Sequence, residues 1–366
     1  MSSPTVTGPE RGCDTGGTAG QYDPVPDAFP VRRRALVTAP LRGPGLERLR
    51  ALADVVHEPW LDQQPLRIYD AAGLADRLAR EDATIAVVES DLVAGPVWDL
   101  PLVAVAATRG DPNNVDLPGA TAAGVPVLHT PGRNADAVAE LTVGLLIAAT
   151  RGIAVADREV RGGEVFRDGT IPYQRFRAWE LAGRRAGLVG LGAVGRAVRW
   201  RLEALGMEVI ACDPYQPDAE VSLAELLATA DVVSLHAAVT GETRGMIGAE
   251  QFATMREGAV FVNTARAALH DTDALVAALQ GGRLAAAALD HLEGEMLPAG
   301  HPLLELPNVV LTSHIGGATY DTEARGAAMI AEDLERLLAG ERPARLANPE
   351  VLGTPAFAER LAGRAS

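Results

Sequence analysis

The chain is poor in cysteine and in aromatic residues. Only Cys13 and Cys212 occur among its 366 residues, so a disulfide framework is excluded and a reducing cytoplasm is the expected setting. Aromatic residues make up 4% of the chain, while hydrophobic residues make up 48%. This balance favours helices packed on parallel strands over an aromatic-rich β design. The length suits two domains of ordinary size.

Basic charge and long apolar runs are also scarce. Acidic residues outnumber basic ones by 48 to 33, for a formal net charge of -15, and such a surface repels phosphate backbones, so we expect no nucleic acid partner. The run LTVGLLIAAT (141–150) is shorter than the ~18 residues that a membrane span needs. Arginines 32–34 precede too short an apolar core for a signal. Neither a membrane anchor nor a targeting segment is predicted.

Short apolar runs alternate with helical patterns in two series. The first series predicts five strands, at 34–39, 55–59, 84–88, 102–107 and 125–130. A helical pattern from Asn134, a plausible N-cap, to about Ala149 leads to a second series of six strands, at 186–191, 208–212, 231–237, 259–265, 285–290 and 309–314. We therefore predict an α/β protein with two doubly wound parallel-sheet domains, Rossmann-like or flavodoxin-like.

The two ends of the chain lack this alternation. Residues 1–32 are rich in Gly, Pro, Thr and Asp without an apolar period, which predicts a disordered tail. A helical pattern runs from after Thr319 to about Leu338, and the Pro-bearing remainder is predicted to be irregular.

Gly190, Gly192 and Gly195 have the spacing GxGxxG, which alone is a weak signal. Here it follows a predicted strand, opens a predicted helix and precedes a strand that ends at Asp213. The glycines permit a tight turn, close approach of a pyrophosphate and close helix–strand packing. Asp213 can accept hydrogen bonds from ribose hydroxyls and repels a 2′-phosphate, so NAD is favoured over NADP. The alternative to a dinucleotide-binding loop is that the three glycines only permit a turn in some other kind of α/β protein.

Three ionisable residues lie at the ends of the last three predicted strands: Arg266 just past the first, Glu295 in the stretch after the second, and His314 as the last residue of the third. Because the carboxyl ends of parallel strands share one edge, where ligands bind, we expect these side chains to lie together. Reduction of a 2-keto acid by hydride needs an acid/base for the hydroxyl proton and a fixed cation for the carboxylate. His314 partnered by Glu295, and the forked guanidinium of Arg266, would supply both. Alternatively, Arg266 is only a surface charge, Glu295 is one of several acids in a polar loop, and His314 is a structural histidine at the sheet edge. We expect no metal site.

The chain from about residue 34 to 345 resembles the D-isomer-specific 2-hydroxyacid dehydrogenase family, which includes 3-phosphoglycerate dehydrogenase. Matching segments follow the family's order: RGDPNNVDL, AAGVPVLHTPGRNADAVAEL, GLVGLGAVGR, DVVSLHAAVTGETRGMI, VNTARAALHD, HPLLELP and LPNVVLTSHIGGAT. The resemblance implies an NAD-dependent oxidoreductase that interconverts a D-2-hydroxy acid and its 2-keto acid. It also implies a split substrate-binding domain (33–131 plus 320–366), an NAD-binding Rossmann domain (132–319) and an active-site cleft between them.

The resemblance also carries residue roles onto this sequence. It makes Arg266 the substrate anchor, Glu295 the histidine's partner and His314 the acid/base. Nucleotide contacts fall on Gly190, Gly192, Ala193, Val194, Gly195, Asp213, His236, Thr264, Ala265, Asp290 and Gly317. Asp290 would bond the nicotinamide amide. The substrate carboxylate would bind near Glu89, Arg109, Gly110 and Asp111.

Three loops depart from the family pattern. Ala267 follows the arginine where glycine is usual, and DHLEGEM places His291 and Met296 where a hydrophobic residue and proline are usual. Asp111 lies in a usually glycine-rich anion loop and would oppose a dianionic substrate unless Arg109 or Arg133 compensates. We expect these changes to affect substrate choice rather than chemistry.

Other members of the same architecture remain as alternatives. A phosphite or phosphonate dehydrogenase keeps the same three residues, whereas a formate-type dehydrogenase pairs its histidine with glutamine instead of Glu295. A non-catalytic NAD(H)-sensing protein, like the family's transcriptional corepressors, is the alternative outside enzymes. A homodimer built through the nucleotide domains is predicted, because the helix from Asn134 is apolar around much of its circumference and the resemblance points the same way.

Overall fold

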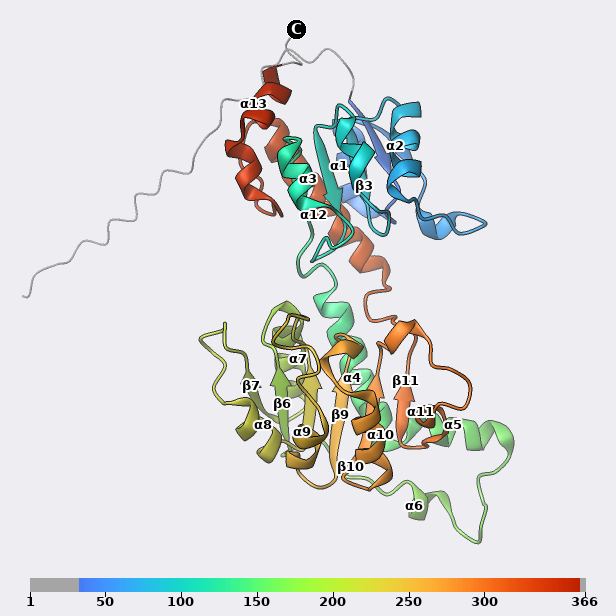
Figure 1. Ribbon diagram of the computed structural model, residues 1–366. Helices are drawn as coiled ribbons and strands as arrows, with labels where there is room; N and C mark the ends of the chain where they lie inside the picture. The colour runs from blue at the N-terminus through green and yellow to red at the C-terminus, as the bar shows by residue number, and fades with distance from the viewer. Residues whose placement is uncertain (1–32, 363–366) are drawn as a thin grey trace, which may run out of the picture. The chain divides into compact units, whose positions relative to one another are not determined.

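The computed structural model describes residues 33–362, so the predicted disordered tail (1–32) lies outside the described residues. The chain divides into two compact units: one runs up to Thr130 and resumes at Ala327, and the other runs from Pro131 to Gly326. Each unit is a parallel sheet covered by helices (Figure 1), which confirms the predicted fold class. The predicted cleft between the domains stays a prediction.

The first unit contains a five-stranded parallel sheet in the order β2-β1-β3-β4-β5. Its strands are β1 (Arg34–Val37), β2 (Asp54–His57), β3 (Ile85–Val88), β4 (Ala104–Ala107) and β5 (Val127–Leu128). This is the flavodoxin-like order. All five strands lie within the predicted segments or one residue outside them.

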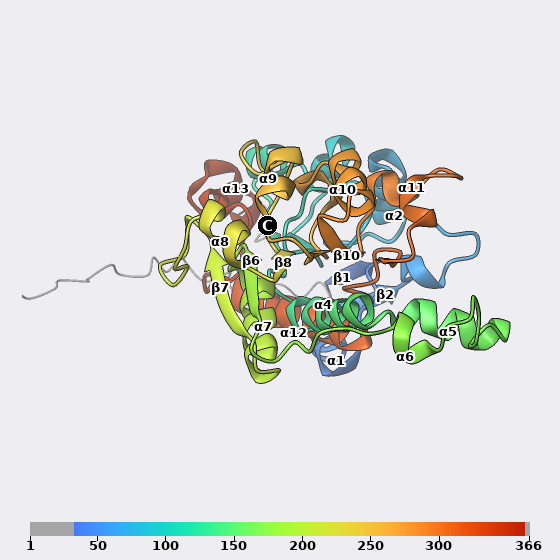
Figure 2. The same ribbon diagram turned by 90° about the horizontal axis from the view of Figure 1, so that it is seen from below.

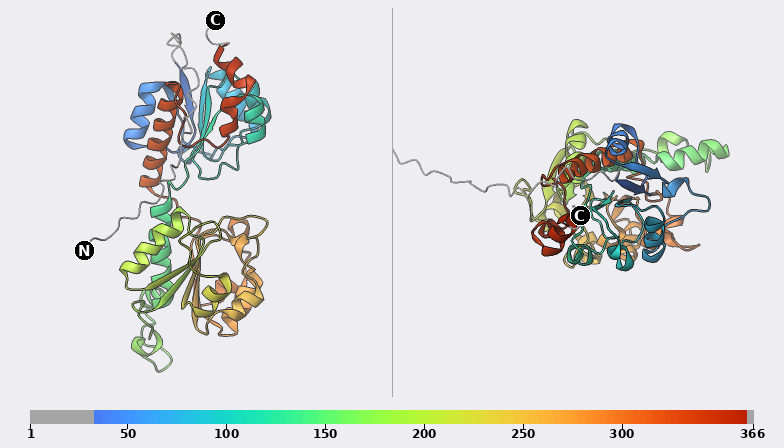
Figure 3. Two further views of the ribbon diagram at one scale, coloured as in Figure 1. Left: turned by 90° about the vertical axis from the view of Figure 1, so that its left-hand side faces the viewer. Right: turned by 90° about the horizontal axis from the view of Figure 1, so that it is seen from above.

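Helices cover both faces of this sheet (Figure 3, left). One face packs against α1 (Gly43–Leu52) and α12 (Tyr320–Leu338), and the other against α2 (Ala71–Arg80) and α3 (Leu117–Ala122). A Cβ atom at Gly45 would collide with the backbone of Ala327 and Ala328. Only glycine therefore permits α1 to approach α12 this closely.

The second unit contains a six-stranded parallel sheet in the order β11-β10-β9-β8-β6-β7. Its strands are β6 (Arg185–Val189), β7 (Glu208–Cys212), β8 (Val232–Leu235), β9 (Ala259–Asn263), β10 (Leu284–Leu289) and β11 (Val309–Leu311). The chain passes from β6 to β7 on one side and then returns to β8 on the other. In doubly wound sheets ligands bind at the carboxyl ends of the two strands that flank such a reversal.

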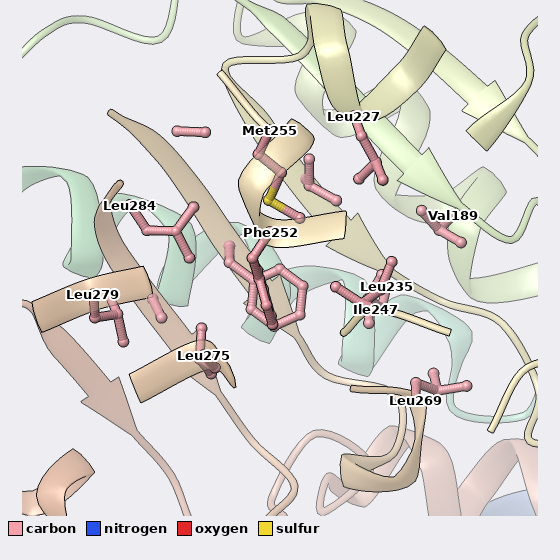
Figure 4. Packing of buried hydrophobic residues seen from close by; sticks show 14 of the residues in the cluster. Val189, Leu227, Leu235, Ile247, Phe252, Met255, Leu269, Leu275, Leu279 and Leu284 are labelled. Atoms are coloured by element: carbon pink, nitrogen blue, oxygen red, sulfur yellow. The ribbon is translucent and has the colours of Figure 1, made fainter. Parts of the chain in front are cut away.

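On one face of this sheet α4 (Ala135–Arg151) packs against α7 (Ala193–Ala204). The other face is covered by α8 (Leu223–Thr229), α9 (Ala249–Thr254) and α10 (Thr272–Gln280), around the apolar cluster shown in Figure 4. Phe252 meets Phe261 of β9 edge to face, with 5.2 Å between the ring centroids. The sheet is thus fixed from both sides, and its carboxyl edge is left to the loops.

Helix α4 is a core helix of the second unit. Six of its residues are buried, and Asn134 stands at its N-cap without a side-chain capping hydrogen bond. In the range 33–362 no single helix is long and apolar enough to cross a membrane. Helices α4 and α5 (Ile153–Gly162), which are bent by 63° relative to each other, reach the required length and composition only when they are taken together. Helices α5 and α6 (Pro172–Arg175) project from the body of this unit (Figure 2).

Two expectations about the C-terminal part need correction. Residues 320–326, predicted to belong to the first unit, belong to the second, where Arg325 Nε donates to the carbonyl of Arg133 (2.8 Å). The stretch predicted to be irregular contains the 3-10 turn η5 (Pro349–Gly353) and helix α13 (Pro355–Ala362). Both elements begin at proline, which is favourable at the first position of a helix. Arg360 of α13 donates to the carbonyls of Trp98 and Leu100 (2.9 and 2.8 Å).

Candidate functional site

The glycine loop lies at the strand reversal of the six-stranded sheet. Gly190 has φ +96°, and a Cβ there would meet the backbone of Ala237 after β8; a Cβ at Gly195 would collide with the carbonyl of Gly190. These two glycines are therefore required by the fold itself. A Cβ at Gly192 would meet nothing within 4 Å. The open space at Gly192 fits the close approach of a pyrophosphate.

The loop continues into the N-terminus of α7. Ala193 and Val194 form its first turn, which carries neither a capping side chain nor an acidic residue, so its backbone N–H groups fit an anion. Asp213, half-buried at the end of β7, accepts hydrogen bonds from the backbone N–H groups of Leu191 (2.8 Å) and Tyr215 (2.9 Å). Asp213 thus ties its own loop to the glycine loop, and its carboxylate keeps acceptor capacity for ribose hydroxyls.

His236 follows β8 at the same reversal. Its Nε2 lies 2.9 Å from the hydroxyl of Ser234, and burial lowers the pKa of His236 to about 4, so the ring is neutral. Its Nδ1 is buried without a hydrogen-bond partner. An unpaired buried ring nitrogen beside the glycine loop fits a polar group of a bound nucleotide.

The loop that carries Arg266 is shaped by Asn263, the last residue of β9. The buried amide of Asn263 donates to the carbonyl of Arg266 (2.9 Å) and lies 3.0 Å from Nδ1 of His270, while it accepts from the N–H of Ala265 (3.0 Å). Thr264, between them, is buried, with its hydroxyl 2.8 Å from that of Thr142 in α4. The guanidinium of Arg266 itself is exposed and donates to the carbonyl of Ala265 (2.7 Å).

Asp290, directly after β10, holds the loop that carries His314. Its buried carboxylate accepts hydrogen bonds from the hydroxyl of Thr312 (2.6 Å) and from the N–H groups of Ile315 (2.9 Å) and Gly316 (2.8 Å). Its carbonyl accepts from the N–H of His314 (2.7 Å). The resemblance gave Asp290 a contact with the nicotinamide amide; in the structure it also positions the histidine. Gly317 follows, and a Cβ there would lie 3.3 Å from the side chain of Asn134.

His314 and Glu295 are brought together as predicted. Nδ1 of His314 lies 3.0 Å from Oε1 of Glu295. Both residues have left-handed backbone, with φ of +58° and +62°, which costs a residue with a Cβ roughly 1–2 kcal/mol. A hydrogen bond donated by Nδ1–H to the carboxylate fixes the ring orientation and leaves Nε2 for a substrate.

His291 joins this pair, although the residues alone gave it no role. Its Nε2 lies 3.4 Å from the same Oε1 of Glu295, and the two histidine rings lie 4.5 Å apart. The three side chains place ligand-type atoms within 4.8 Å of one another. However, a metal-binding histidine donates its other ring N–H to an acceptor, whereas Nδ1 of His291 accepts from the N–H of Ala267 (3.3 Å). This pattern fits a hydrogen-bonded cluster better than a metal site.

The predicted substrate residues lie in the first unit, at the carboxyl ends of β3 and β4. Oε2 of Glu89 accepts from the indole N–H of Trp60 (2.9 Å), and Arg109 donates to the carbonyl of Glu89 (3.4 Å). The carbonyl of Gly110 lies 2.8 Å from Nδ1 of His129, and Asp111 is exposed. Glu89, Arg109 and Gly110 therefore belong to one edge of this sheet.

Known proteins to which the chain is similar point to one family. A family model described as the NAD binding domain of D-isomer specific 2-hydroxyacid dehydrogenases matches residues 143–316. Glyoxylate reductase of Thermofilum pendens is 38% identical over 332 residues, which cover 88% of this chain and 96% of that protein. D-3-phosphoglycerate dehydrogenase of Methanocaldococcus jannaschii is 39% identical over 246 residues, 64% of this chain and 45% of that protein. The crystal structure of a Thermus thermophilus protein has a TM-score of 0.73 at 37% identity and covers 86% of this chain and 99% of that one.

Proposed function

Since the chain belongs to the D-isomer specific 2-hydroxyacid dehydrogenase family, we propose that it reduces a small monoanionic 2-keto acid to the D-2-hydroxy acid with NADH. The chain is an NAD-dependent oxidoreductase of this family. The observation that carries the specific proposal is the 3.0 Å contact of His314 with Glu295, at the sheet edge that also bears Arg266 and the glycine loop.

In this proposal His314 is the acid/base. Its Nδ1–H donates to Glu295 in a charge-assisted hydrogen bond that orients the ring, and its Nε2–H gives a proton to the substrate carbonyl oxygen. NAD(H) supplies the hydride that reaches the carbonyl carbon. His314 is left neutral and regains its proton from solvent. Oxidation of the hydroxy acid uses the same groups in reverse.

Arg266 is the proposed substrate anchor. Its carbonyl is held by Asn263 and its guanidinium donates to the carbonyl of Ala265, so the side chain starts from a fixed backbone. A guanidinium can hold a carboxylate with two parallel hydrogen bonds and thereby orient the adjacent carbonyl group. Orientation of this kind is a large part of what an enzyme contributes to a two-substrate step.

We propose NAD rather than NADP because the residues around the ribose position offer no compensation for a 2′-phosphate. Asp213 is a carboxylate, which would repel that group. Arg196, on α7, is paired with Asp218 and donates to Gln216 (2.7 Å). Its charge is therefore already neutralised.

The proposed substrate is a short monoanion of the glyoxylate type. Asp111 adds a negative charge to the edge that carries Gly110 and Arg109, whose guanidinium donates to the carbonyl of Glu89, and a second charge on the substrate would be repelled by Asp111. The Thermofilum pendens relative, matched over 96% of its length, is named a glyoxylate reductase. A phosphorylated keto acid is disfavoured by the same charge.

A homodimer in the cytoplasm, built through the nucleotide domains as expected from the sequence, is also proposed, but with α5 and α6 rather than α4 at the contact. The apolar face of α4 is buried within its own unit. The projecting segment around α5 and α6 instead exposes large apolar side chains, among them Val160 (66% exposed), Phe166 (77%) and Tyr173 (85%). Apolar side chains gathered in this way are typical of interfaces. Phe166→Asp with Tyr173→Asp should give monomers in sedimentation, whereas Leu66→Asp, on the first unit, should not; a parent chain of monomer mass would refute the dimer.

The central test is NADH oxidation with a panel of glyoxylate, pyruvate, hydroxypyruvate and 3-phosphohydroxypyruvate, run in parallel with NAD reduction by formate and by phosphite. We expect turnover of the first three, with glyoxylate preferred, and Asp111→Asn should improve only the phosphorylated acid. His314→Ala should lower turnover by ~10²–10⁴-fold with NADH affinity little changed. Turnover of formate or phosphite alone, or NADH binding without any turnover, would contradict the proposal.

A further inference from the structure

His291 contacts both halves of the proposed catalytic machinery. Its Nδ1 accepts from the backbone N–H of Ala267, the residue after Arg266 (3.3 Å), and its Nε2 lies 3.4 Å from the Glu295 oxygen that His314 also approaches. Its side chain is only 17% exposed. One imidazole therefore connects the loop of the substrate anchor with the acid/base pair.

The contact with Ala267 determines the tautomer of His291. A ring nitrogen that accepts from an N–H carries a lone pair, so in the neutral ring the proton resides on Nε2. Burial and the neighbouring His314 lower the pKa of His291, while Glu295 and Asp290 oppose this and Arg266 adds to it. The neutral ring thus presents Nε2–H near Glu295, which then has two imidazole N–H groups close to one oxygen.

From this geometry, and on the basis of the proposed function, we propose that His291 is a positioning residue for hydride transfer: it holds the Arg266 loop through Ala267 and shares the carboxylate of Glu295 with His314. An apolar residue at this position could do neither. Without an acceptor, the buried N–H of Ala267 would lose its partner and the anchor loop would shift. Without the second N–H, Glu295 would accept from His314 alone, in a stronger charge-assisted hydrogen bond, and the alkaline limb of reduction would move to higher pH.

The two contacts can be separated by substitution. The Oδ1 of asparagine can take the place of Nδ1, so His291→Asn keeps an acceptor for Ala267 and loses the donor near Glu295. The amide of glutamine can reach the place of Nε2, so His291→Gln keeps the donor and loses the acceptor. His291→Leu loses both. Each variant is compared with the parent by the KM for glyoxylate, by the pH profile of kcat/KM for reduction, and by NADH affinity as a control for folding.

We expect His291→Leu to raise KM by roughly 5-fold, the equivalent of about one net hydrogen bond, and to move the alkaline limb of reduction up by roughly half a pH unit. His291→Asn should restore KM but keep the shifted limb, and His291→Gln should restore the limb but keep the raised KM. The inference would be wrong if His291→Leu had the KM and the alkaline limb of the parent. It would also be wrong if His291→Asn did not restore KM and His291→Gln did not restore the limb. Should the leucine variant not fold, the two amides decide the question between them.

Failure of this inference is distinguishable from failure of the proposed function. The same assays on His314→Ala report the proposed acid/base directly. If that variant is inactive while the three His291 variants match the parent, only the role of His291 is refuted. If His314→Ala retains turnover, the assignment of the acid/base is refuted, and the role of His291 with it.

Discussion

Asn263 offers the sharpest test of how the site is built, because one buried amide positions the Arg266 loop. Its side chain serves three groups: the carbonyl of Arg266, the N–H of Ala265 and Nδ1 of His270. Asn263→Ala removes all three hydrogen bonds and introduces no charge. The substitution therefore isolates the contribution of the amide.

The expected loss of stability in Asn263→Ala depends on how buried each hydrogen-bond partner of the amide is. His270 is buried (6% exposed), so its Nδ1 should bear the full cost of an unsatisfied group, about 1–3 kcal/mol. Ala265 is half-buried and Arg266 is exposed, so water can replace the amide there and each loss should be about 0.5–1.5 kcal/mol. Together these losses predict destabilisation of the second unit by about 2–6 kcal/mol, or a fall in thermal midpoint of roughly 10 °C.

The catalytic consequence should differ from that of a general loss of stability. A loosened Arg266 loop misorients the anchor, so we expect KM for glyoxylate to rise by roughly 10-fold at a temperature where the variant is folded, with a smaller fall in kcat. Asn308→Ala is the matched control, because Asn308 is half-buried and its amide donates a solvent-exposed hydrogen bond to the carbonyl of Ala285 in the same sheet (3.0 Å). If Asn263→Ala changed KM and midpoint no more than Asn308→Ala does, the loop would not depend on this amide.

Two further predictions concern the choice of cofactor and the buried histidine His270. Asp213→Ala with Tyr215→Arg should shift the ratio of catalytic efficiencies toward NADP, and an unchanged ratio would refute the role of Asp213 in cofactor choice. Burial lowers the pKa of His270 from 6.5 to about 4, so the stability it contributes is full above pH 6.5 and is lost as the pH falls toward 4. His270→Asn, which keeps an acceptor for Asn263 but cannot titrate, should lose less stability in urea over that interval than the parent; equal losses would contradict the assignment.

The strands could be predicted from sequence because each is a short uninterrupted apolar run. The segment 208–212 coincides with β7 and 309–314 begins at the first residue of β11. Runs of this kind read as strands buried on both faces, and the glycines and polar residues after them mark the turns. The helix α13 was missed because proline was taken as a sign of irregular chain, whereas here Pro355 is the first residue of the helix.

The long-range contacts of polar side chains could not be predicted in the same way. Arg266, Glu295 and His314 were predicted to share an edge because parallel strands end together. By contrast, the three hydrogen bonds of Asn263 and the shared contact of His291 depend on loop conformations that no periodicity encodes. The one available signal for Asn263 was its position as a polar residue closing the apolar run AVFV. His291 stood out only as a departure from the family pattern.

Glu295→Gln tests the charge of the acid/base pair without altering its shape. Glu295 and His314 both adopt left-handed backbone, and glutamine has the same size, so the loop should keep its conformation. The neutral amide accepts a weaker hydrogen bond from the Nδ1–H of His314 than the carboxylate does. The alkaline limb for reduction should therefore move to lower pH, by roughly half to one unit because the Glu295 side chain is 56% exposed and solvent screens its charge.

Glu293→Gln is the matched control for this prediction, because Glu293 lies on the same short turn η4 (Glu293–Glu295) and is also exposed. It removes an equal charge two residues away, so it reports the general effect of a less acidic loop. We expect its pH profile to follow the parent. If Glu295→Gln kept the parent rate and profile while Glu293→Gln moved the limb, the carboxylate that acts on His314 would be that of Glu293. The 3.0 Å contact of Glu295 with His314 would then have a structural role only.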